Sequence, residues 1–346
     1  MSNKLNVVIL GASYGSLFAV KLSMAGHAVK LVCLPNEAQL INSEGQNGQI
    51  EICTHDLPGP VSACGPEEIN PRDHDLVVLA MQEPQYRHAG IRKLLGAVHE
   101  SGRPCMSIMN MPPLPYLQRI PGLDVDACHD CYSDVSVWEG FDPDLMTLCS
   151  PDPQAFRPPD EAINILQVRL PTNFKAARFK SDEHTELLRR LEADITNARY
   201  QHGNELIEIP VKLRVHESIF VPMAKWSMLL AGNYRCIGPD DMRSIRDAVH
   251  ADLNESREVY EWVSELCGLL GADADDLVPF EKYANAAKSL ITPSSAARAL
   301  AAGVPNIERV DRLVQTIAAG RGLRLAAIDN TVKRVDSWLE RNREAS

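Results

Sequence analysis

The sequence lacks any apolar run long enough to cross a membrane, since a transmembrane helix needs about 18 to 20 consecutive apolar residues. Its first residues, MSNKLNVVILGASYG, also lack the basic, apolar and small-residue pattern of a signal peptide. Lysine and arginine form no cluster, and the formal net charge of -11 is spread along the chain. A surface without a basic stripe cannot neutralise a phosphate backbone. We therefore expect no membrane segment and no nucleic acid partner.

The cysteines give no sign of a disulfide framework or of a zinc site. There are nine of them, an odd number without regular spacing, which is typical of a reducing compartment. The one close pair, Cys128 and Cys131 in CHDC, is followed by no second CxxC and by no histidine pair at zinc-finger spacing. We expect structural thiols on a strand at 124–130, no bound metal and a cytoplasmic protein.

At 346 residues the chain is too long for one ordinary core, so its length favours two domains. The first 35 residues give the clearest local pattern, in which a strand at 6–10 is followed by a glycine turn at 11–16, a helix at 17–27 and a strand at 28–34. This order predicts a βαβ unit with parallel strands.

Strands at 74–81 and 104–111, separated by a helical segment, continue the alternation and predict a doubly wound Rossmann-type sheet. A β-rich stretch at 163–179 and an amphipathic helix at 182–200 follow. Beyond about residue 204 the apolar residues recur at helical spacing, which predicts a second, helical domain. The predicted helical segments are 215–233, 240–270, 280–302 and 306–342. We expect domains at 1–203 and 204–346, and a helical domain able to form a homodimer.

The glycine turn departs from the dinucleotide fingerprint G-x-G-x-x-G, because its glycines are spaced G-x-x-x-G with Ser13 in the middle. Such a turn either binds phosphate at the helix N-terminus or merely joins a strand to a helix, and its placement after the first strand favours the nucleotide site. The second strand ends in Leu34, with Glu37 a few residues later, which leaves NADH and NADPH both open. The candidate cofactor-binding residues of the turn are Gly11, Ser13, Tyr14, Gly15 and Ser16.

Over nearly its full length the chain resembles the ketopantoate reductase family, the 2-dehydropantoate 2-reductases. The stretch LGASYGSLFAVKLSMAGHAVKLV is similar to the family's opening GxGxxGxxxAxxLxxxGHxVxLV. In DHDLVVLAMQEPQY, Gln82 stands at a lysine position and Gln85 at a glutamine position on the cofactor side, while SIMNMPP keeps Asn110 beside the nicotinamide. The resemblance implies NADP(H) or NAD(H) as cofactor and a helical domain like that of 6-phosphogluconate dehydrogenase. The departures mark a divergent member.

The family places a catalytic lysine on a helix, with asparagines four and eight residues later. Counted from Lys225, the fourth residue is Leu229 and the eighth is Asn233. A rival register puts Met228 at the lysine and Gly232 at the first asparagine, which would remove the chemistry. The kept lysine-to-asparagine spacing favours Lys225.

The stretch TPSSAARALAAGVPNIERVDRLV resembles the family's serine–glutamate motif. It implies that Ser294 and Ser295, with Asn233, bind the substrate and that Glu308 orients the catalytic Lys225. A general acid of this kind protonates the developing alkoxide while the nicotinamide gives a hydride. In the plainer interpretation, Lys225 is a solvated helix lysine and Glu308 a first-turn carboxylate that favours the helix dipole.

The resemblance thus implies an NAD(P)H-dependent reductase of a small 2-oxo carboxylic acid. One alternative is an opine-type dehydrogenase, which reduces the imine of an amino acid and a 2-oxo acid. Another is a relative that has lost hydride transfer and binds a nucleotide or a small acid.

Overall fold

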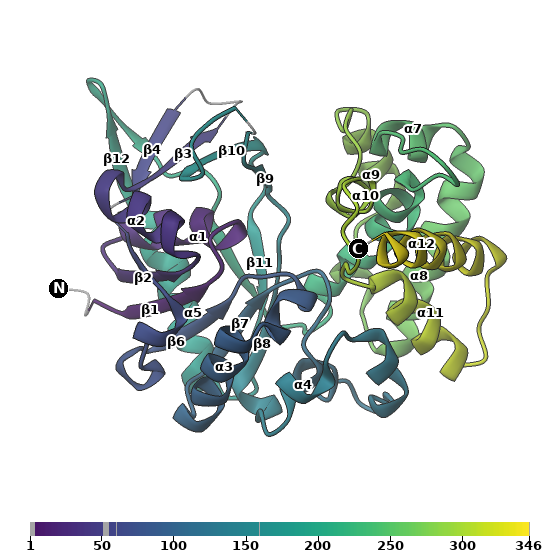
Figure 1. Cartoon of the computed structure of the whole chain (residues 1–346), viewed down its shortest axis with the longest axis horizontal. Coiled ribbons are helices and arrows are strands. Elements are labelled where there is room, and N and C mark those ends of the chain that lie inside the picture. Colours follow the sequence, from purple (N-terminus) through teal and green to yellow (C-terminus); the bar gives the residue numbers. More distant parts are fainter. Residues whose placement is uncertain (1–3, 51–54, 60, 159, 346) are drawn as a thin grey trace. The chain divides into compact units, whose positions relative to one another are not determined.

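The structure is a computed structural model that describes residues 4–50, 55–59, 61–158 and 160–345. Figure 1 shows the chain coloured by sequence. It divides into two compact units, here called the sheet unit and the helical unit. The sheet unit comprises Met1–Met81, Gln85–Tyr116 and Ser136–Pro222. The helical unit comprises Gln82–Pro84, Leu117–Val135 and Met223–Ser346.

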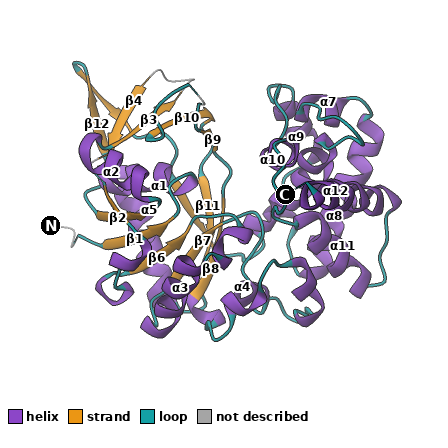
Figure 2. Ribbon diagram, viewed as in Figure 1, coloured by secondary structure: helices purple, strands orange, loops and turns teal. Residues whose placement is uncertain are grey.

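The sheet unit is built on a mostly parallel sheet, which has eight strands in the described residues (Figure 2). Strands β5, β2, β1, β6, β7 and β8 are parallel neighbours, β11 is antiparallel to β8, and β14 is parallel to β11. In sheet order they are β14 (Leu213–His216), β11 (Phe174–Ala177), β8 (Met146–Ser150), β7 (Cys105–Ile108), β6 (Leu76–Leu79), β1 (Asn6–Leu10), β2 (Ala28–Val32) and β5 (Ser62–Cys64).

The inner strand β1 is apolar from its second residue onward, because both of its faces are covered there. Val7, Val8, Ile9 and Leu10 are all fully buried, although successive side chains point to opposite faces. Continuous apolar strands of this kind are typical of parallel sheets packed on both sides. The helices of this unit are α1 (Tyr14–Met24), α2 (Pro35–Glu44), α3 (Ala89–Ser101), α4 (Leu114–Leu117) and α5 (Asp182–Asn197).

Two smaller sheets accompany the main one. A four-stranded sheet has the order β4 (His55–Gly59), β3 (Gln46–Ile50), β10 (Ile165–Leu170) and β9 (Gln154–Phe156). A hairpin pairs β12 (Arg199–His202) with β13 (Glu205–Glu208). The short 3-10 helices of the chain up to the last strand are η1 (Pro66–Glu68), η2 (Pro71–Asp73), η3 (Glu83–Arg87), η4 (Asp126–Cys131), η5 (Val135–Trp138) and η6 (Pro143–Leu145).

The helical unit is helical throughout most of its length, as the apolar spacing predicts. Its elements after Pro222 are α6 (Lys225–Met228), η8 (Leu229–Asn233), η9 (Tyr234–Cys236), α7 (Ile245–His250), α8 (Leu253–Leu270), η10 (Ala274–Asp276), α9 (Phe280–Ala287), α10 (Ser295–Ala301), α11 (Val310–Gly320) and α12 (Ala326–Glu344), preceded by η7 (Val221–Ala224). Local caps fix where these helices begin. The Asp252 carboxylate, for example, accepts bonds from the backbone N–H groups of Asn254 and Glu255 at the start of α8.

The fold class is confirmed, with a parallel-sheet Rossmann-type unit and a helical unit. The predicted strand at 124–130 is wrong, because residues Asp126–Cys131 form the 3-10 helix η4. The Asp124 carboxylate accepts a bond from the backbone N–H of Ala127, which starts a turn rather than a strand. The thiols there are structural as expected: burial raises the pKa of Cys128 to about 12, and the eight cysteines of the described residues are all free.

The helical unit takes in two earlier segments, and its last and longest segment begins at Met223, whereas the sequence pattern divides the chain once, at 203/204. The difference arises because β14 pairs in parallel with β11 along the four residues from Leu213 to His216. The chain therefore returns to the main sheet before entering the helical unit. The sequence of these four residues does not by itself predict a strand.

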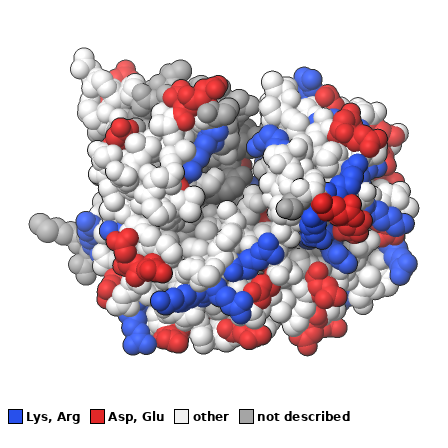
Figure 3. Space-filling view, viewed as in Figure 1, with Lys and Arg blue, Asp and Glu red and all other residues white. Residues whose placement is uncertain are grey.

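Charged side chains of both signs lie next to one another over the visible surface of each unit (Figure 3). Among the helices of the described residues, none has both the length and the apolar character required to cross a bilayer. In the same part of the chain, no three histidine, cysteine, aspartate or glutamate side chains gather in a way that could hold a metal ion.

Candidate functional site

The glycine turn joins β1 to α1, and its two glycines are required by packing. Gly11 has a φ of +104°, and an added Cβ would lie 2.5 Å from the Ala80 carbonyl oxygen. At Gly15 an added Cβ would lie 2.7 Å from Cγ2 of Ile9, so this glycine lets α1 pack closely on β1. Two of the three roles of the dinucleotide fingerprint, the tight turn and the helix–strand contact, are thus filled.

The remaining turn residues divide between exposed and structural positions. Ser13 is exposed at the tip of the turn. The Ser16 hydroxyl is used within the fold, because it donates to the Ala12 carbonyl and accepts a 2.7 Å bond from Gln46 Nε2. Tyr14 begins α1, but its side chain lies outside the described part of the structure.

An arginine from a distant segment closes the other side of the turn. Arg157, which follows β9, donates from its guanidinium to the Ala12 carbonyl and to the Glu37 carboxylate. The Arg157 side chain is 28% exposed and that of Glu37 only 8%, so the guanidinium covers the carboxylate. The sequence pattern pointed to Glu37 but not to Arg157, because nothing in the local sequence indicates that residue 157 contacts the glycine turn.

The other cofactor-side candidates follow β6, which neighbours β1, and β7, the strand beyond it. Strand β6 pairs with both β1 and β7 in parallel register, so the carboxyl ends of the three strands share one edge of the sheet. Gly11 follows β1, and the half-buried Asn110 follows β7 at this edge. Gln82 and Gln85 follow β6 and are both exposed. Ligands of doubly wound folds bind at such an edge.

The helix that carries Lys225 changes its hydrogen-bond register halfway. It is α-helical over Lys225–Met228 and π-helical over Leu229–Asn233, where the Tyr234 N–H bonds to the Leu229 carbonyl five residues back. A π turn takes one residue more than an α turn, which shifts every later side chain around the axis. Such turns occur often at functional sites.

The side chains around this change of register differ in exposure. Lys225, Met228 and Asn233, here called the accessible face, are half-buried, whereas Leu229 is only 4% exposed and packs inward. Leu229, the fourth residue after Lys225, is therefore not presented together with Lys225 and Asn233. The choice between the Lys225 and the Met228 register stays a prediction.

Gly232 is a packing position beside this face. An added Cβ would lie 2.0 Å from the Tyr283 hydroxyl oxygen, which donates a 3.1 Å bond to the Met228 carbonyl. Tyr283 thus satisfies a carbonyl at the junction between the α and π turns, and only glycine leaves room for it. The signal in the sequence is the glycine itself, in an otherwise apolar helix.

Of the two candidate serines, Ser294 has a structural role. The Ser294 hydroxyl donates a 2.7 Å bond to the Asn233 carbonyl and accepts one from the Ala297 N–H, which caps α10. It is 2% exposed. Ser295 is exposed at the first position of α10. The motif therefore contributes one structural serine, which fixes the Asn233 backbone, and one accessible serine.

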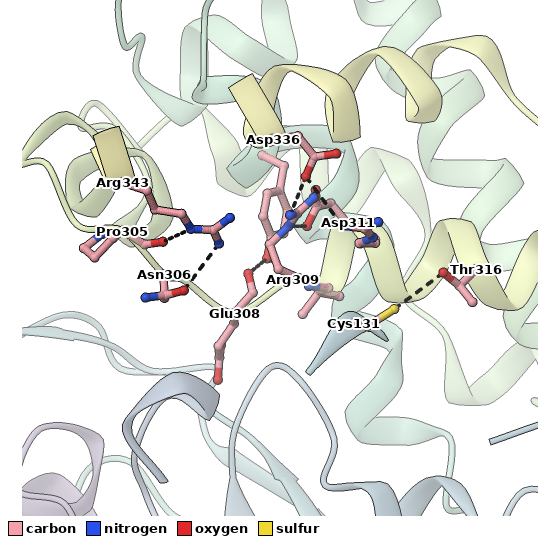
Figure 4. A network of polar contacts seen from close by, with 12 residues as sticks. Cys131, Pro305, Asn306, Glu308, Arg309, Asp311, Thr316, Asp336 and Arg343 are labelled. Carbon is pink, nitrogen blue, oxygen red and sulfur yellow. Dashed lines mark hydrogen bonds and ion pairs between the residues drawn. The ribbon is translucent and has the colours of Figure 1, made fainter. Parts of the chain in front are cut away.

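Glu308 lies before α11 rather than in its first turn, because that helix begins at Val310. Its carbonyl accepts a 2.5 Å bond from the Tyr234 hydroxyl, and its Oε1 accepts a longer 3.4 Å bond from the Glu83 backbone N–H. Figure 4 shows its side chain pointing away from Arg309 and Asp311. The interpretation as a first-turn carboxylate does not fit this position.

The neighbouring charges are paired among themselves. Arg309 forms two 2.9 Å bonds with Asp311 and one of 2.6 Å with Asp336. Burial raises the pKa of Asp311, and the Arg309 guanidinium opposes this. Burial also holds the pKa of the Tyr234 phenol well above its usual range, so this hydroxyl stays a neutral donor to Glu308.

Sequence analysis missed Glu83, which is 2% exposed and follows β6. Its Oε1 accepts a 2.9 Å bond from the Ser133 N–H and its Oε2 a 2.9 Å bond from the Ser133 hydroxyl. Tyr132 lies close enough for Glu83 and Glu308 both to raise its pKa, although burial is the main cause. The local sequence gave little indication of a role for Glu83, which is a single acidic residue between two glutamines.

Comparison with known proteins gives no match by sequence, since no protein-family model and no curated protein matches the chain. Solved structures match over almost the whole chain. A candidate ketopantoate reductase from Ralstonia solanacearum MolK2 has a TM-score of 0.69 at 14% identity, covering 99% of both chains. D-mandelate dehydrogenase in complex with NADH and anilino(oxo)acetate has a TM-score of 0.67 at 12% identity, covering 98% of this chain and 100% of the other.

A third structure, 2-dehydropantoate 2-reductase from Methylococcus capsulatus, has a TM-score of 0.65 at 14% identity and covers 98% of each chain. Identities this low establish the fold and leave the activity to be argued from the residues. The resemblance noted in the sequence is confirmed at this level: the chain has, over its full length, the fold of the ketopantoate reductases and of D-mandelate dehydrogenase.

Proposed function

We propose that the protein is an NAD(P)H-dependent reductase of a small 2-oxo carboxylic acid. The observation that carries the proposal is the shared edge of β1, β6 and β7, where Gly11 follows β1 and Asn110 follows β7, the parallel strands on either side of β6. Full-length structural neighbours that reduce 2-dehydropantoate or bind NADH support it. When bound, the nicotinamide supplies the hydride.

The turn residues fit a dinucleotide. Gly11 and Gly15 fill the two packing roles of the fingerprint, and Ser13 is exposed at the tip of the turn. Beside the turn, the guanidinium of Arg157 is more exposed than the carboxylate of Glu37 that it covers. An anionic group that approaches here meets a positive charge first, which favours the ribose 2′-phosphate of NADPH over the free hydroxyl of NADH.

The proposal assigns the proton to Lys225 and substrate contacts to the same unit. Lys225 and Asn233 are both half-buried positions of the same helix, so we assign this one ammonium and one amide to the substrate together. The ammonium would protonate the alkoxide that forms from the 2-oxo group and stabilise its charge beforehand. The proposal assigns substrate binding to the exposed Ser295, while Ser294 holds the Asn233 backbone.

The test begins with nicotinamide fluorescence during titration of the protein with NADPH and NADH. We expect both to bind, NADPH more tightly; binding of neither would remove the proposal. Lys225→Met should then lower kcat for a 2-oxo acid by about 10² to 10⁴, the usual contribution of a general acid. Lys282→Met, at an exposed lysine of the same unit, is the matched control and should leave kcat unchanged. A kcat within about tenfold of the wild type would exclude Lys225 as the proton donor.

A further inference from the structure

Glu83 is a buried carboxylate that the proposed reaction does not use. A charged carboxylate is costly to bury unless hydrogen bonds replace its water. Here Ser133 supplies two, one from its backbone N–H and one from its hydroxyl, each 2.9 Å long. Both oxygens of Glu83 are thereby bound to one residue, which fixes the direction of the side chain.

The clamp between Glu83 and Ser133 holds a very short segment in place. Only Gln82–Pro84 of the region after β6 packs with the helical unit, and the residues on either side pack with the sheet unit. Ser133 belongs to the second segment of the helical unit, Leu117–Val135. The side chain of Glu83 is thus the polar link between two separate segments of that unit.

The backbone of the same residue faces Glu308. The Glu83 N–H donates to Glu308 Oε1 at 3.4 Å, although the two residues are 225 positions apart in the sequence. The other end of Glu308 is fixed as well, because its carbonyl accepts from the Tyr234 hydroxyl, which also accepts from the Val310 N–H. Glu308 is therefore oriented by Tyr234 at its backbone and by Glu83 at its carboxylate.

We propose that Glu83 is a positioning residue for Glu308, in which the clamp by Ser133 presents the Glu83 N–H to the Glu308 carboxylate. The inference rests on the proposed function, in which Lys225 donates the proton, together with the family resemblance, which implies that Glu308 orients this lysine. It adds a residue from the end of β6 to the set that shapes the reaction. Removing the clamp should free the N–H, and the Glu308 carboxylate should lose its orientation while Tyr234 still holds its backbone.

A double-mutant cycle on kcat separates this role from a structural one. Glu83→Ala should lower kcat by about 10²-fold, the usual cost of a catalytic group misplaced by a small distance. In the Glu308→Ala background the same substitution should lower kcat by no more than about twofold, because the group that Glu83 positions is gone. Equal losses in both backgrounds would overturn the proposal.

Glu83→Gln keeps the test valid if the alanine variant does not fold. Its amide oxygen can accept from the Ser133 N–H and its amide N–H can donate to the Ser133 hydroxyl, so the clamp is kept while the charge is removed. We expect Glu83→Gln to retain most of the kcat. A loss as large as in Glu83→Ala would contradict positioning by geometry. Glu340→Ala, at an exposed carboxylate of α12, is the control and should leave kcat unchanged.

Amide hydrogen exchange measured by NMR decides the geometric claim without any turnover. In the wild type the Glu83 amide should be protected, and Glu308→Ala should speed its exchange by about fivefold, since one hydrogen bond is worth about 1 kcal/mol. Unchanged exchange would overturn the inference even in an active enzyme. Faster exchange in a protein that reduces no 2-oxo acid would instead refute the proposed function and leave the clamp in place.

Discussion

Gly232→Ala tests the origin of the π turn beneath the proposed catalytic face. An alanine Cβ would lie 2.0 Å from the Tyr283 hydroxyl oxygen and 3.2 Å from the Cγ2 atoms of Ile245 and Val249. Overpacking a core costs about 1 to 3 kcal/mol, and loss of the Tyr283 bond to the Met228 carbonyl about 0.5 to 1.5 kcal/mol. Elsewhere in a helix the same change gains about 0.5 to 1 kcal/mol. We therefore expect a net loss of about 0.5 to 4 kcal/mol.

The assay is chemical unfolding followed by tryptophan fluorescence, since Trp226 is buried in α6 beside the π turn. Tyr283→Phe removes the oxygen that an added Cβ would meet. The double variant should therefore lose at least about 1 kcal/mol less than the sum of the two single variants.

Gly268→Ala in α8 is the matched control, because an added Cβ there meets no atom within 4 Å, and it should not destabilise the protein. Additive losses for Gly232 and Tyr283, or a Gly232→Ala variant as stable as the wild type, would refute this account of the turn.

Three further predictions concern the turn, the serines and pH. Arg157→Gln should weaken NADPH binding about 10- to 100-fold, as expected for a charged hydrogen bond, and change NADH binding less; equal losses in a fluorescence titration would mean that the Arg157–Glu37 pair only supports the turn. Ser294→Ala should cost about 1 kcal/mol in chemical unfolding through loss of a helix cap, whereas Ser295→Ala should leave stability unchanged and raise KM; the reverse pattern would contradict their assignment. Burial lowers the pKa of His27, whose Nδ1 accepts from a backbone N–H, so the unfolded state binds more protons below its ordinary pKa of 6.5. The free energy of unfolding should therefore be highest above pH 6.5 and should fall as the pH drops from 6.5 toward the lower pKa of the folded protein. Urea unfolding at a series of pH values measures this, and a His27→Asn variant should lack that part of the pH dependence.

Much of the fold follows from local patterns. The strand at 6–10, the glycine turn and the helix after it lie where alternation predicts them, because a parallel strand covered on both faces must be continuously apolar. The helical unit likewise follows from apolar spacing. The strand expected at 124–130 is wrong because one hydrogen bond, from the Ala127 N–H to the Asp124 carboxylate, starts a turn there. The local composition is compatible with both a strand and a turn.

The site was less predictable, for two physical reasons. A π turn depends on a hydrogen-bond shift supported by Tyr283, which is 55 residues away from its acceptor Met228, so counting residues along an ideal helix did not reveal that Leu229 is buried. Contacts across the chain are the second reason. The bonds of Arg157 to Ala12 and of Glu83 to Glu308 join segments that no local pattern connects. The sequence indicated which side chains could take part in the chemistry. It did not indicate which distant residues bond to one another.

The central claim is tested most directly by following NADPH consumption with a panel of small 2-oxo acids, each offered alone and together with amino acids. The account predicts oxidation of NADPH by a 2-oxo acid alone, and a loss of that rate in Lys225→Met. Consumption only when an amino acid is also present would indicate imine reduction instead. No consumption with any acid, in a protein that binds NADPH, would contradict the claim that it is a reductase of 2-oxo acids.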